Sequence, residues 1–395
     1  MSDTKFTVLI PTRERADVLA SCIQSVVAQD YPDLEILVSD NCSEDRTADV
    51  VRAFGDPRIR YVNPGRRLAM SQHWEFALSH VEEGWLTIVG DDDGLLPGAL
   101  RRVDEIRRKY GVAAVVSHNA AYQWPSASGD RFGRLSVGRG TNCELRASGE
   151  WLGKALAGKV AYSALPMLYT GGFADTRLVR EARDGQGVFY RSMVPDVYSA
   201  VVFARLTDHY VYSHEPLAVG GTSRHSTGTA HFAPAKAGKA AANPADRFFT
   251  ESNIPFHPDL AVPEDASPPQ SIELLVYESF LQSMHLAGPG ESMPDPFDQL
   301  LIALGHAKRR HRDNVAKWAE GFARQHGLDL AKAMRAARRI RKREKVRKSV
   351  RGLLQRFNKT DITGSERLPI SNVYDAGIVA ATLVTQGCGR GRRRE

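Results

Sequence analysis

Three consecutive carboxylates, Asp91, Asp92 and Asp93, directly follow the apolar run Leu86–Val89 in the segment LTIVGDDDGLLPGAL. Adjacent like charges repel, so a fold that brings these side chains together needs a metal ion, basic side chains or solvent to offset them. In an extended segment, the side chains of Asp91 and Asp93 point to the same side. Carboxylate oxygens are hard ligands that suit Mg²⁺ or Mn²⁺. The triplet therefore predicts a divalent cation site, and the alternative is an acidic turn that caps a helix over 96–110.

An alternation of short apolar runs and amphipathic stretches must position these acids. Strands are expected where branched and aromatic residues concentrate, over Phe6–Ile10, Leu34–Asp40, Ile59–Val62, Trp85–Gly90 and Val112–Ser117. Between them, apolar residues recur at helical spacing over 18–27, and Ser43 is the expected N-cap of a helix in SEDRTADVVRAF. Strands that alternate with helices predict an α/β fold with a mostly parallel sheet covered on both faces.

The residues that follow each expected strand are the places where chemistry is expected, because ligands bind at the carboxyl ends of the strands in such sheets. The first strand is followed by PTRER, the second ends in SDNCSED and the fourth in GDDDG, so polar and acidic residues collect at one edge. The chain has neither GxGxxG after its first strand nor GxxxxGK[ST]. A divalent cation that bridges the acids to a diphosphate would hold a nucleotide without such a glycine-rich loop.

Composition limits the classes of protein to which the chain can belong. A chain of 395 residues with 42% hydrophobic residues can bury a large core, and its length favours two domains or one domain plus an extension. The four cysteines lack CxxC spacing, which indicates neither a zinc site nor a disulfide framework. The N-terminal residues do not read as a signal peptide, and no apolar run approaches the roughly 18 residues of a membrane span. We therefore expect a cytoplasmic protein.

The N-terminal part resembles the inverting family 2 glycosyltransferases, which have a GT-A fold and use nucleotide sugars. In FTVLIPTRERADVLASCIQSVVAQDYPDLEILVSDNCSEDRT, the matching residues are Pro11, Thr12, Asp40, Ser43 and Asp45. The resemblance implies that the first two strand ends hold the base and ribose of the donor. It assigns this role to Pro11, Thr12, Arg13, Glu14 and Asp40.

Further motifs extend the resemblance. GDDDGLLPGAL is similar to the family's DxD region, which implies donor contacts from Asp91 and Asp92 and a metal ligand in Asp93. RSMVPDVYSAVVFARL resembles the segment with the catalytic base, where Asp196 matches the second acid of a pair and Pro195 replaces the first. HEPLAVGGTSRHSTGTA matches the closing stretch, in which His225 reaches the metal or the diphosphate. RRLAMSQHWEFAL aligns less well, and it suggests Arg66 or Arg67 as contacts to base or phosphate.

The resemblance implies a hexosyltransferase that moves a sugar from a UDP-, GDP- or dTDP-sugar to the hydroxyl of a saccharide or lipid-linked acceptor. Mn²⁺ or Mg²⁺ on Asp93 and His225 would offset the charge of the departing diphosphate. Asp196 would act as general base, and a single displacement would invert the anomeric carbon.

The resemblance covers roughly residues 5–230, and we expect a GT-A domain over 1–232, a linker over 233–270, a helical basic region over 271–360 and a disordered tail over 361–395. The block RAARRIRKREKVRK, residues 335–348, holds nine basic residues of fourteen, within a net charge of +7. A weakly amphipathic basic helix gains about 1 kcal/mol per Lys or Arg near anionic lipid. The block thus indicates peripheral attachment to the inner face of the cell membrane, or simply a solvated helical face.

Other functions stay open at this point. A sugar-nucleotide pyrophosphorylase would share the sheet and the acids but needs a Gly-rich basic loop where this chain has PTRER. A nucleic-acid-binding protein is not favoured, because the basic block lacks interleaved aromatic residues. For the residues that match, alternative roles are an N-cap for Asp196, a surface loop for His225 and plain turn chemistry for Asp40 and Ser43.

Overall fold

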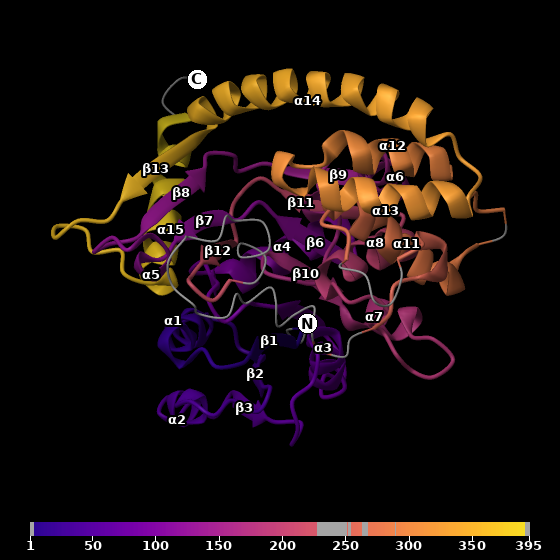
Figure 1. The fold of residues 1–395 in the computed structure, drawn as a ribbon. Coiled ribbons are helices and arrows are strands. Elements are labelled where there is room, and N and C mark those ends of the chain that lie inside the picture. The colour runs from indigo at the N-terminus through magenta and orange to yellow at the C-terminus, as the bar shows by residue number, and fades with distance from the viewer. Residues whose placement is uncertain (1–3, 227–250, 252–253, 263–267, 289, 392–395) are drawn as a thin grey trace.

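The computed structural model describes residues 4–226, 251, 254–262, 268–288 and 290–391. The linker expected over 233–270 therefore lies largely outside the described residues. The described part contains two sheets, helices on both faces of the larger one, and a C-terminal group of helices (Figure 1). None of the described helices has both the length and the apolar composition needed to cross a bilayer.

The larger sheet has eight strands in the order β3-β2-β1-β4-β10-β6-β11-β9. β10 and β9 run against the other six strands, so the expectation of a mostly parallel sheet is confirmed. The bounds, in chain order, are β1 Phe6–Thr12, β2 Leu34–Asp40, β3 Ile59–Val62, β4 Trp85–Ile88, β6 Ala114–Ser117, β9 Cys143–Ala147, β10 Gly172–Asp175 and β11 His209–Ser213.

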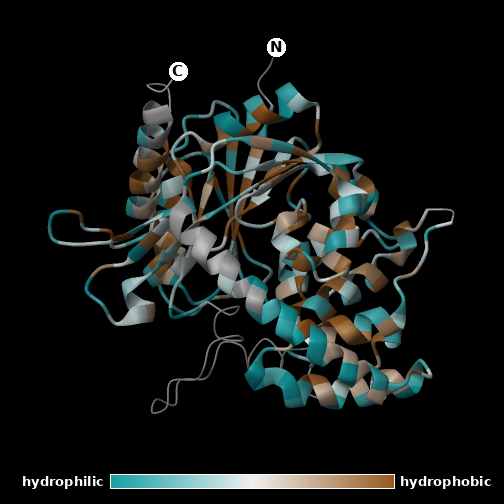
Figure 2. Ribbon diagram, turned by 90° about the horizontal axis from the view of Figure 1, so that it is seen from above, coloured by the Kyte–Doolittle hydropathy of each residue, from teal (hydrophilic) through white to brown (hydrophobic). Residues whose placement is uncertain are grey.

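Side chains alternate along β1 and β2 and bury both faces of the sheet. Val8 and Ile10 pack on one face with α1 and α4, whereas Leu9 packs on the other face with α3 and α8. The helices of this part are α1 Ala16–Val27, α2 Thr47–Arg52, α3 Met70–Leu78, α4 Ala99–Tyr110, α5 Pro125–Ser128, α6 Ser148–Leu156, η1 Tyr162–Ala164, α7 Thr176–Ala182 and α8 Pro195–Leu206. Figure 2 shows hydrophobic strands at the centre of the molecule, which agrees with the burial of both faces of the sheet.

The smaller sheet has the order β13-β8-β7-β12-β5. Its bounds are β5 Gly94–Leu95, β7 Ala120–Gln123, β8 Arg134–Gly138, β12 Ala218–Thr222 and β13 Lys359–Thr363. β5 directly follows the acidic triplet, and it pairs antiparallel with β12 through Leu95 and Ala218. This pairing brings the chain after β12 to the triplet, although the two segments are far apart in the sequence.

The C-terminal region is helical, as expected for the fold class. Its elements are η2 Pro258–Leu260, α11 Ile272–Gln282, η3 Met284–Leu286, α12 Pro296–His306, η4 Arg309–His311, α13 Arg312–Gln325, α14 Leu330–Asn358 and α15 Val373–Gly391. The helices α11 to α14 share a core of their own that includes Leu300, Trp318 and Phe322. α14 arches over the outside of this group (Figure 1).

Two local expectations were wrong. The tail over 361–395 is not disordered where it is described: residues up to Thr363 complete β13, and α15 buries Val373 and Ala380 against the smaller sheet. An apolar face within VYDAGIVAATLV explains this packing. α2 begins at Thr47 rather than after Ser43, whose hydroxyl instead accepts a hydrogen bond from the backbone N–H of Glu14 at 2.8 Å.

Candidate active site

The ends of β1 and β2 lie side by side. Thr12 and Asp40 are register partners in the parallel ladder, and Pro11 is the partner of Ser39. Asp40 is buried, and its carboxylate accepts hydrogen bonds from the Ser43 backbone at 3.0 Å and the Tyr61 hydroxyl at 2.6 Å. The structure therefore brings together Pro11, Thr12 and Asp40, as predicted, at one edge of the sheet.

The loop after β1 is held by contacts with the loop after β2. Glu14 has a left-handed backbone conformation, with φ of 55°, which is uncommon for a residue other than glycine. Its carboxylate accepts hydrogen bonds from the backbone of Glu44 and Asp45 and pairs with Arg67. Arg13 pairs with Glu251 at 2.7 Å. Glu14 and Arg67 thus lie together, and a hollow of about 470 Å³ beside them is lined by Arg66, Arg67, Leu68, Ala69, Gln72 and Glu251.

The three acids of the triplet are buried, and each has different partners. Asp91 is 2% exposed and forms an ion pair with Arg15, with 2.6 Å between oxygen and nitrogen. Burial raises the pKa of Asp91, and Arg15 partly opposes this shift. Arg15 also donates a hydrogen bond to the backbone carbonyl of His225, so it ties the triplet to the chain after β12. The triplet does not cap a helix, because α4 begins at Ala99 after the N-cap Gly98.

Asp92 is held by hydroxyl groups from the chain after β12. Its Oδ2 accepts hydrogen bonds from the hydroxyls of Ser223 and Ser226, both at 2.6 Å. The backbone N–H of Ser223 donates to the same oxygen at 3.3 Å. These contacts follow from the pairing of β5 with β12, which places both serines beside the triplet.

Asp93 is fixed from two sides by neutral donors. The Thr170 hydroxyl donates to Oδ2 at 2.5 Å, and the backbone N–H of Gly221 donates to Oδ1 at 2.6 Å. Gly221 must be glycine, because a Cβ atom there would clash with the backbone oxygen of Asp92. Burial and the negative charge of Asp92 raise the pKa of Asp93 to about 7. The carboxylate is therefore costly to ionise without added positive charge.

The donor set around Asp92 and Asp93 suits a hard cation. In the described part of the chain, no basic residue forms an ion pair with either carboxylate, and no group of three or more His, Cys, Asp or Glu residues has the arrangement of a complete metal site. Mg²⁺ commonly binds to one or two carboxylates together with substrate phosphates rather than in an all-protein cage. The residues present fit a cation of that kind.

His225 does not contact Asp93. Its Nε2 lies 3.0 Å from the carboxylate of Asp17, at the start of α1. The backbone N–H of His225 donates to the Ser223 hydroxyl, so the residue is close to the triplet through its backbone while its ring faces α1. In this arrangement His225 is not a ligand beside Asp93, which departs from the role that the resemblance implied.

Asp196 lies in the first turn of α8, after the N-cap Val194, so it is not the N-cap of this helix. Its Oδ2 accepts a hydrogen bond from the Tyr162 hydroxyl at 2.6 Å. Burial raises the pKa of Asp196, and the hydrogen bond from Tyr162 partly opposes this shift. A partly buried carboxylate with a raised pKa and one side-chain partner can accept a proton.

Tyr169 links the triplet to Asp196. Burial raises the pKa of Tyr169 well above its usual value, and the charges of Asp93, Asp92, Asp196 and Asp91 raise it further. The tyrosine ring also stacks on Trp74, with 5.5 Å between the ring centres. The four predicted acids therefore lie within electrostatic range of one phenol.

Sequence reasoning did not identify several of these partners. The segment AYSALPMLYTGGF supplies Tyr162, Tyr169 and Thr170, but it has no motif and no regular spacing that would have indicated them. Arg15 stands in PTRER, and Ser223 and Ser226 flank Arg224 and His225. Arg15, Ser223 and Ser226 could have been predicted from the sequence. Basic and hydroxyl residues beside two recognised motifs are natural hydrogen-bond partners for three buried acids.

The N-terminal part of the chain, which includes the acidic triplet, matches known proteins. Residues 7–144 match the family model "Glycosyl transferase family 2". The chain is 37% identical over 99 residues to GalNAc(5)-diNAcBac-PP-undecaprenol beta-1,3-glucosyltransferase of Campylobacter jejuni, a match that covers 24% of this chain and 32% of that protein. It is 29% identical over 99 residues to the succinoglycan biosynthesis protein ExoO of Rhizobium meliloti, covering 25% and 28% respectively.

The matches span about a third of the length of these curated relatives. Among solved structures, TarS of S. aureus in complex with UDP-GlcNAc aligns with 82% of this chain and 93% of its own, at 13% identity and a TM-score of 0.45. The family match begins within β1 and ends within β9, so it includes Thr12, Asp40 and the acidic triplet. Residues 7–144 belong to glycosyltransferase family 2.

Proposed function

We propose that this protein transfers a sugar from a nucleoside diphosphate sugar to an acceptor hydroxyl in a single, inverting displacement of the hexosyltransferase type. The observation that carries the proposal is that three buried carboxylates, Asp91, Asp92 and Asp93, and the partly buried carboxylate of Asp196 all lie close enough to Tyr169 for their charges to raise its pKa. Three of these acids lie in the family 2 match, and the fourth comes from a separate helix. The reaction needs negative groups in two places, one for the donor and one for the acceptor.

The donor is proposed to bind along the edge formed by β1, β2 and β4. Asp40 and Thr12 adjoin each other there, and the hollow beside Arg66 and Arg67 provides space and positive charge for base or phosphate. UDP-, GDP- and dTDP-sugars all carry the diphosphate that such an edge would accommodate. Asp91 is proposed to orient Arg15 at this edge, because its ion pair fixes the guanidinium group.

Asp92 and Asp93 are the residues that would hold Mn²⁺ or Mg²⁺ together with the donor diphosphate. When bound, the cation would offset the charge that develops on the departing diphosphate. The hydrogen bonds from Thr170, Gly221 and Ser223 fix the orientation of the two carboxylates before the donor arrives. A donor set fixed in this way costs little reorganisation during the reaction.

Asp196 is proposed as the general base. The acceptor hydroxyl loses a proton as it attacks, and a partly buried carboxylate with a raised pKa is suited to take that proton. Tyr162 donates to one carboxylate oxygen, and the backbone N–H groups of Val197 and Asp196 also donate to the carboxylate. A carboxylate with these donors keeps lone pairs that can accept the proton of the acceptor hydroxyl. One base on the face opposite the leaving group gives inversion.

The acceptor is proposed to be a saccharide or a lipid-linked saccharide. The name of the Campylobacter jejuni relative describes transfer to a saccharide on undecaprenyl diphosphate. Such acceptors lie at the inner face of the cell membrane, and α14 offers a surface for attachment there. Its exposed cations include Arg335, Arg338, Arg339, Lys342, Arg343 and Lys345.

Vesicle co-sedimentation tests the membrane proposal. The full chain should pellet with vesicles that contain anionic lipid at low salt, and less so at moderate salt because of screening. A variant with Arg339→Glu and Lys342→Glu should pellet less. Equal pelleting of both proteins would show that α14 is a solvated face. Charge reversal is preferable to truncation here, because α15 and β13 lie beyond α14 and complete the smaller sheet.

A thermal-shift panel of UDP-, GDP- and dTDP-sugars, with and without Mn²⁺, tests the proposed function. Stabilisation grows as RT ln(1 + [L]/Kd), about 2.7 kcal/mol at a ligand concentration of 100 Kd, so the true donor should stand out. Product analysis should then find free nucleoside diphosphate. Pyrophosphate as the product would indicate a nucleotidyltransferase, and the absence of any nucleotide-dependent shift would refute the proposal.

A further inference from the structure

Tyr169 is fixed to the acidic triplet by its neighbour and by its own hydroxyl. The Thr170 hydroxyl donates to Asp93 at 2.5 Å and accepts a hydrogen bond from the backbone N–H of Gly90 at 3.1 Å. The Tyr169 hydroxyl also donates to the Asp93 carboxylate. A Cβ atom at Gly90 would lie 2.5 Å from both the Tyr169 oxygen and Oδ2 of Asp93. The two oxygens therefore meet over the backbone of Gly90, where any larger residue would push them apart.

The same segment is fixed to the helix that carries the proposed base. The backbone N–H of Leu168 donates to the hydroxyl oxygen of Ser199 at 3.0 Å. That hydroxyl donates in turn to the backbone carbonyl of Asp196, one turn earlier in α8, also at 3.0 Å. Tyr169 directly follows Leu168, so its backbone lies between an anchor on the triplet and an anchor on α8.

The ring of Tyr169 is supported on one face by Trp74. The two rings stack with 5.5 Å between their centres and an angle of 24° between their planes. Trp74 is buried and packs edge-on against Tyr190, whereas Tyr169 is partly exposed. Because Trp74 covers one face of the Tyr169 ring, the exposed surface of Tyr169 belongs to the opposite face or to the edge of the ring. The tyrosine therefore offers a rigid surface to a ligand beside Asp93.

A single displacement would place the transferred sugar between the same two groups of acids. The departing diphosphate is proposed to lie at Asp92 and Asp93, and the attacking hydroxyl at Asp196. The anomeric carbon must lie between the bond that breaks and the bond that forms, because the attack comes from the face opposite the leaving group. Tyr169 lies within electrostatic range of Asp93 and of Asp196, so it stands beside the path of the reaction.

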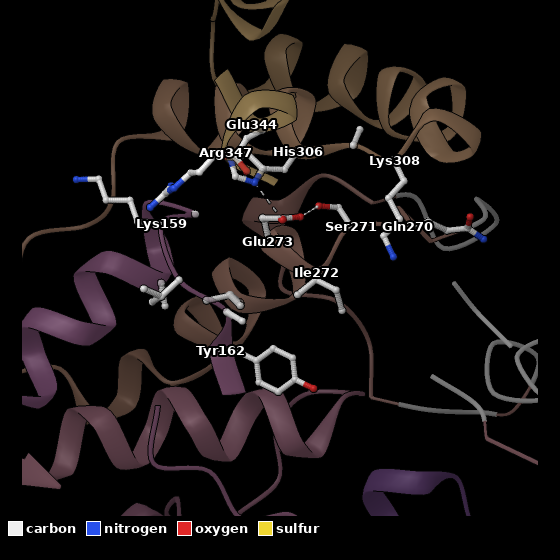
Figure 3. A pocket seen from close by; sticks show the side chains of 16 residues that line it. Lys159, Tyr162, Gln270, Ser271, Ile272, Glu273, His306, Lys308, Glu344 and Arg347 are labelled. Carbon is white, nitrogen blue, oxygen red and sulfur yellow. Dashed lines mark hydrogen bonds and ion pairs between the residues drawn. The ribbon is translucent and has the colours of Figure 1, made fainter. Parts of the chain in front are cut away.

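The cavity beyond Tyr162 does not offer another place for the sugar. It measures about 290 Å³ and lies between the end of α6, the start of α11, the end of α12 and α14 (Figure 3). Tyr162 lines it and separates it from Asp196, to which the Tyr162 hydroxyl donates at 2.6 Å. In its wall, Glu273 is already paired with His306 at 3.4 Å, as a dashed line in Figure 3 shows. This leaves the Tyr169 side of Asp196 for the sugar.

We propose, given the function proposed above, that Tyr169 contacts the transferred sugar and that its phenol oxygen accepts a hydrogen bond from a hydroxyl group of that sugar. A phenol has one proton to donate and lone pairs that accept. The proton of Tyr169 is donated to Asp93, so a lone pair remains for the sugar and the side chain does not need to move. The ligand is a nucleotide sugar with a free hydroxyl on the side that faces this tyrosine.

Calorimetric titrations of the full chain, with Mn²⁺ and without an acceptor, test the inference. The probes are UDP with UDP-glucose and UDP-N-acetylglucosamine, GDP with GDP-mannose, and dTDP with dTDP-glucose. The measured quantity is the affinity for the nucleotide sugar divided by the affinity for its nucleoside diphosphate. An effect of Tyr169 on Asp93 alone would change both affinities alike and leave this ratio unchanged.

Tyr169→Phe is the test variant, and Tyr190→Phe is the matched control, because Tyr190 packs against the same Trp74 but is only 1% exposed. For the nucleotide sugar that the wild type binds best, we expect Tyr169→Phe to lower the ratio about threefold to tenfold, the usual size of one hydrogen bond. Tyr190→Phe should stay within about twofold of the wild type.

An unchanged ratio in Tyr169→Phe would overturn the inference, and so would an equal fall in both variants. A fall of both affinities at a constant ratio would show that Tyr169 only orients Asp93. Failure of the wild type to bind any of these nucleotides would instead refute the proposed function, and the inference with it.

Discussion

The acidic triplet is buried and Asp196 is partly buried, and the two are held in different ways. The triplet has partners on every carboxylate: an arginine on Asp91, two serines on Asp92, and a threonine and a backbone N–H on Asp93. Asp196 has one side-chain partner, Tyr162. Several fixed hydrogen-bond donors suit a carboxylate that must keep its position and bind a positively charged group. A carboxylate with one side-chain donor and a raised pKa is suited to take a proton.

The two regions also differ in how they are assembled. The triplet depends on a sheet, because β5 pairs with β12 and so brings the two serines and Gly221 to it. Asp196 depends on a helix end and on a tyrosine from η1. The triplet is therefore coupled to the rigid core, whereas the partner of Asp196, Tyr162, lines a cavity that is bounded by helices α11, α12 and α14 of the C-terminal region. This difference suits a fixed donor site and an acceptor site that can vary.

Replacing the proposed base should have the largest effect. Asp196→Asn keeps the size of the side chain but cannot accept the acceptor proton, so we expect sugar transfer to fall by about 10²-fold or more. The rate of transfer is measured as the incorporation of radiolabelled sugar into a lipid and glycan extract. Asp313→Asn is the matched control, because Asp313 also lies in the first turn of a helix but is exposed and remote from the acids. Turnover near that of the wild type would move the role of base to another residue.

Replacing Asp93 should change how stability depends on pH. The pKa of Asp93 is about 7 in the folded chain against 3.8 for an unperturbed group, so the folded state holds a proton that the unfolded state releases. Stability should therefore fall as pH rises from about 4 to about 7 in the absence of metal. Asn at position 93 cannot ionise, so the variant avoids this loss of stability. Asp93→Asn should be more stable than the wild type at pH 8, by on the order of 1 kcal/mol or more.

Denaturant unfolding of the two proteins at pH 5 and pH 8, without divalent cations, measures this difference. The increase in the free energy of unfolding of Asp93→Asn over the wild type should be larger at pH 8 than at pH 5. Asp313→Asn, with its exposed carboxyl, should show no such gain. A variant that is equally or less stable than the wild type at pH 8 would show that Asp93 is ionised at little cost.

The sequence predicted the strand ends better than the contacts between them. Thr12, Asp40 and the triplet fall where the alternation of strands and helices placed them, because period and β-branched composition mark buried parallel strands directly. The antiparallel strand β10, between β4 and β6, and its neighbour Thr170 had no local signal. Their position follows from sheet order, which a pattern along the chain does not encode.

Asp196 and α15 illustrate two other limits. The motif identified Asp196, but not Tyr162, which lies 34 residues earlier in a segment without periodicity. The basic composition near the C-terminus led to a prediction of disorder and obscured the apolar face of α15. Composition averages over a segment, whereas packing needs only one apolar face.

Removing the hydroxyl of Tyr162 should change the transfer rate less than the substitutions of Asp196 and Asp93. Its hydrogen bond lowers the pKa of Asp196, so Tyr162→Phe should raise that pKa and shift the acidic limb of the rate profile to higher pH. We expect transfer to fall about threefold on the acidic side and to approach the wild-type rate at high pH. The control is Tyr212→Phe, on β11, whose ring packs over Arg146. A uniform loss at all pH values would indicate a purely structural role for Tyr162.

The central claim is that the triplet binds the donor with its cation and that Asp196 serves only the transfer step. Calorimetric titration of the donor nucleotide, with and without Mn²⁺, into the wild type, Asp93→Asn and Asp196→Asn tests it most directly. We predict that Asp93→Asn weakens Mn²⁺-dependent binding at least about tenfold and that Asp196→Asn stays within a few-fold of the wild type. Unchanged Mn²⁺-dependent affinity in Asp93→Asn, or an equal loss in Asp196→Asn, would contradict this division between the two regions.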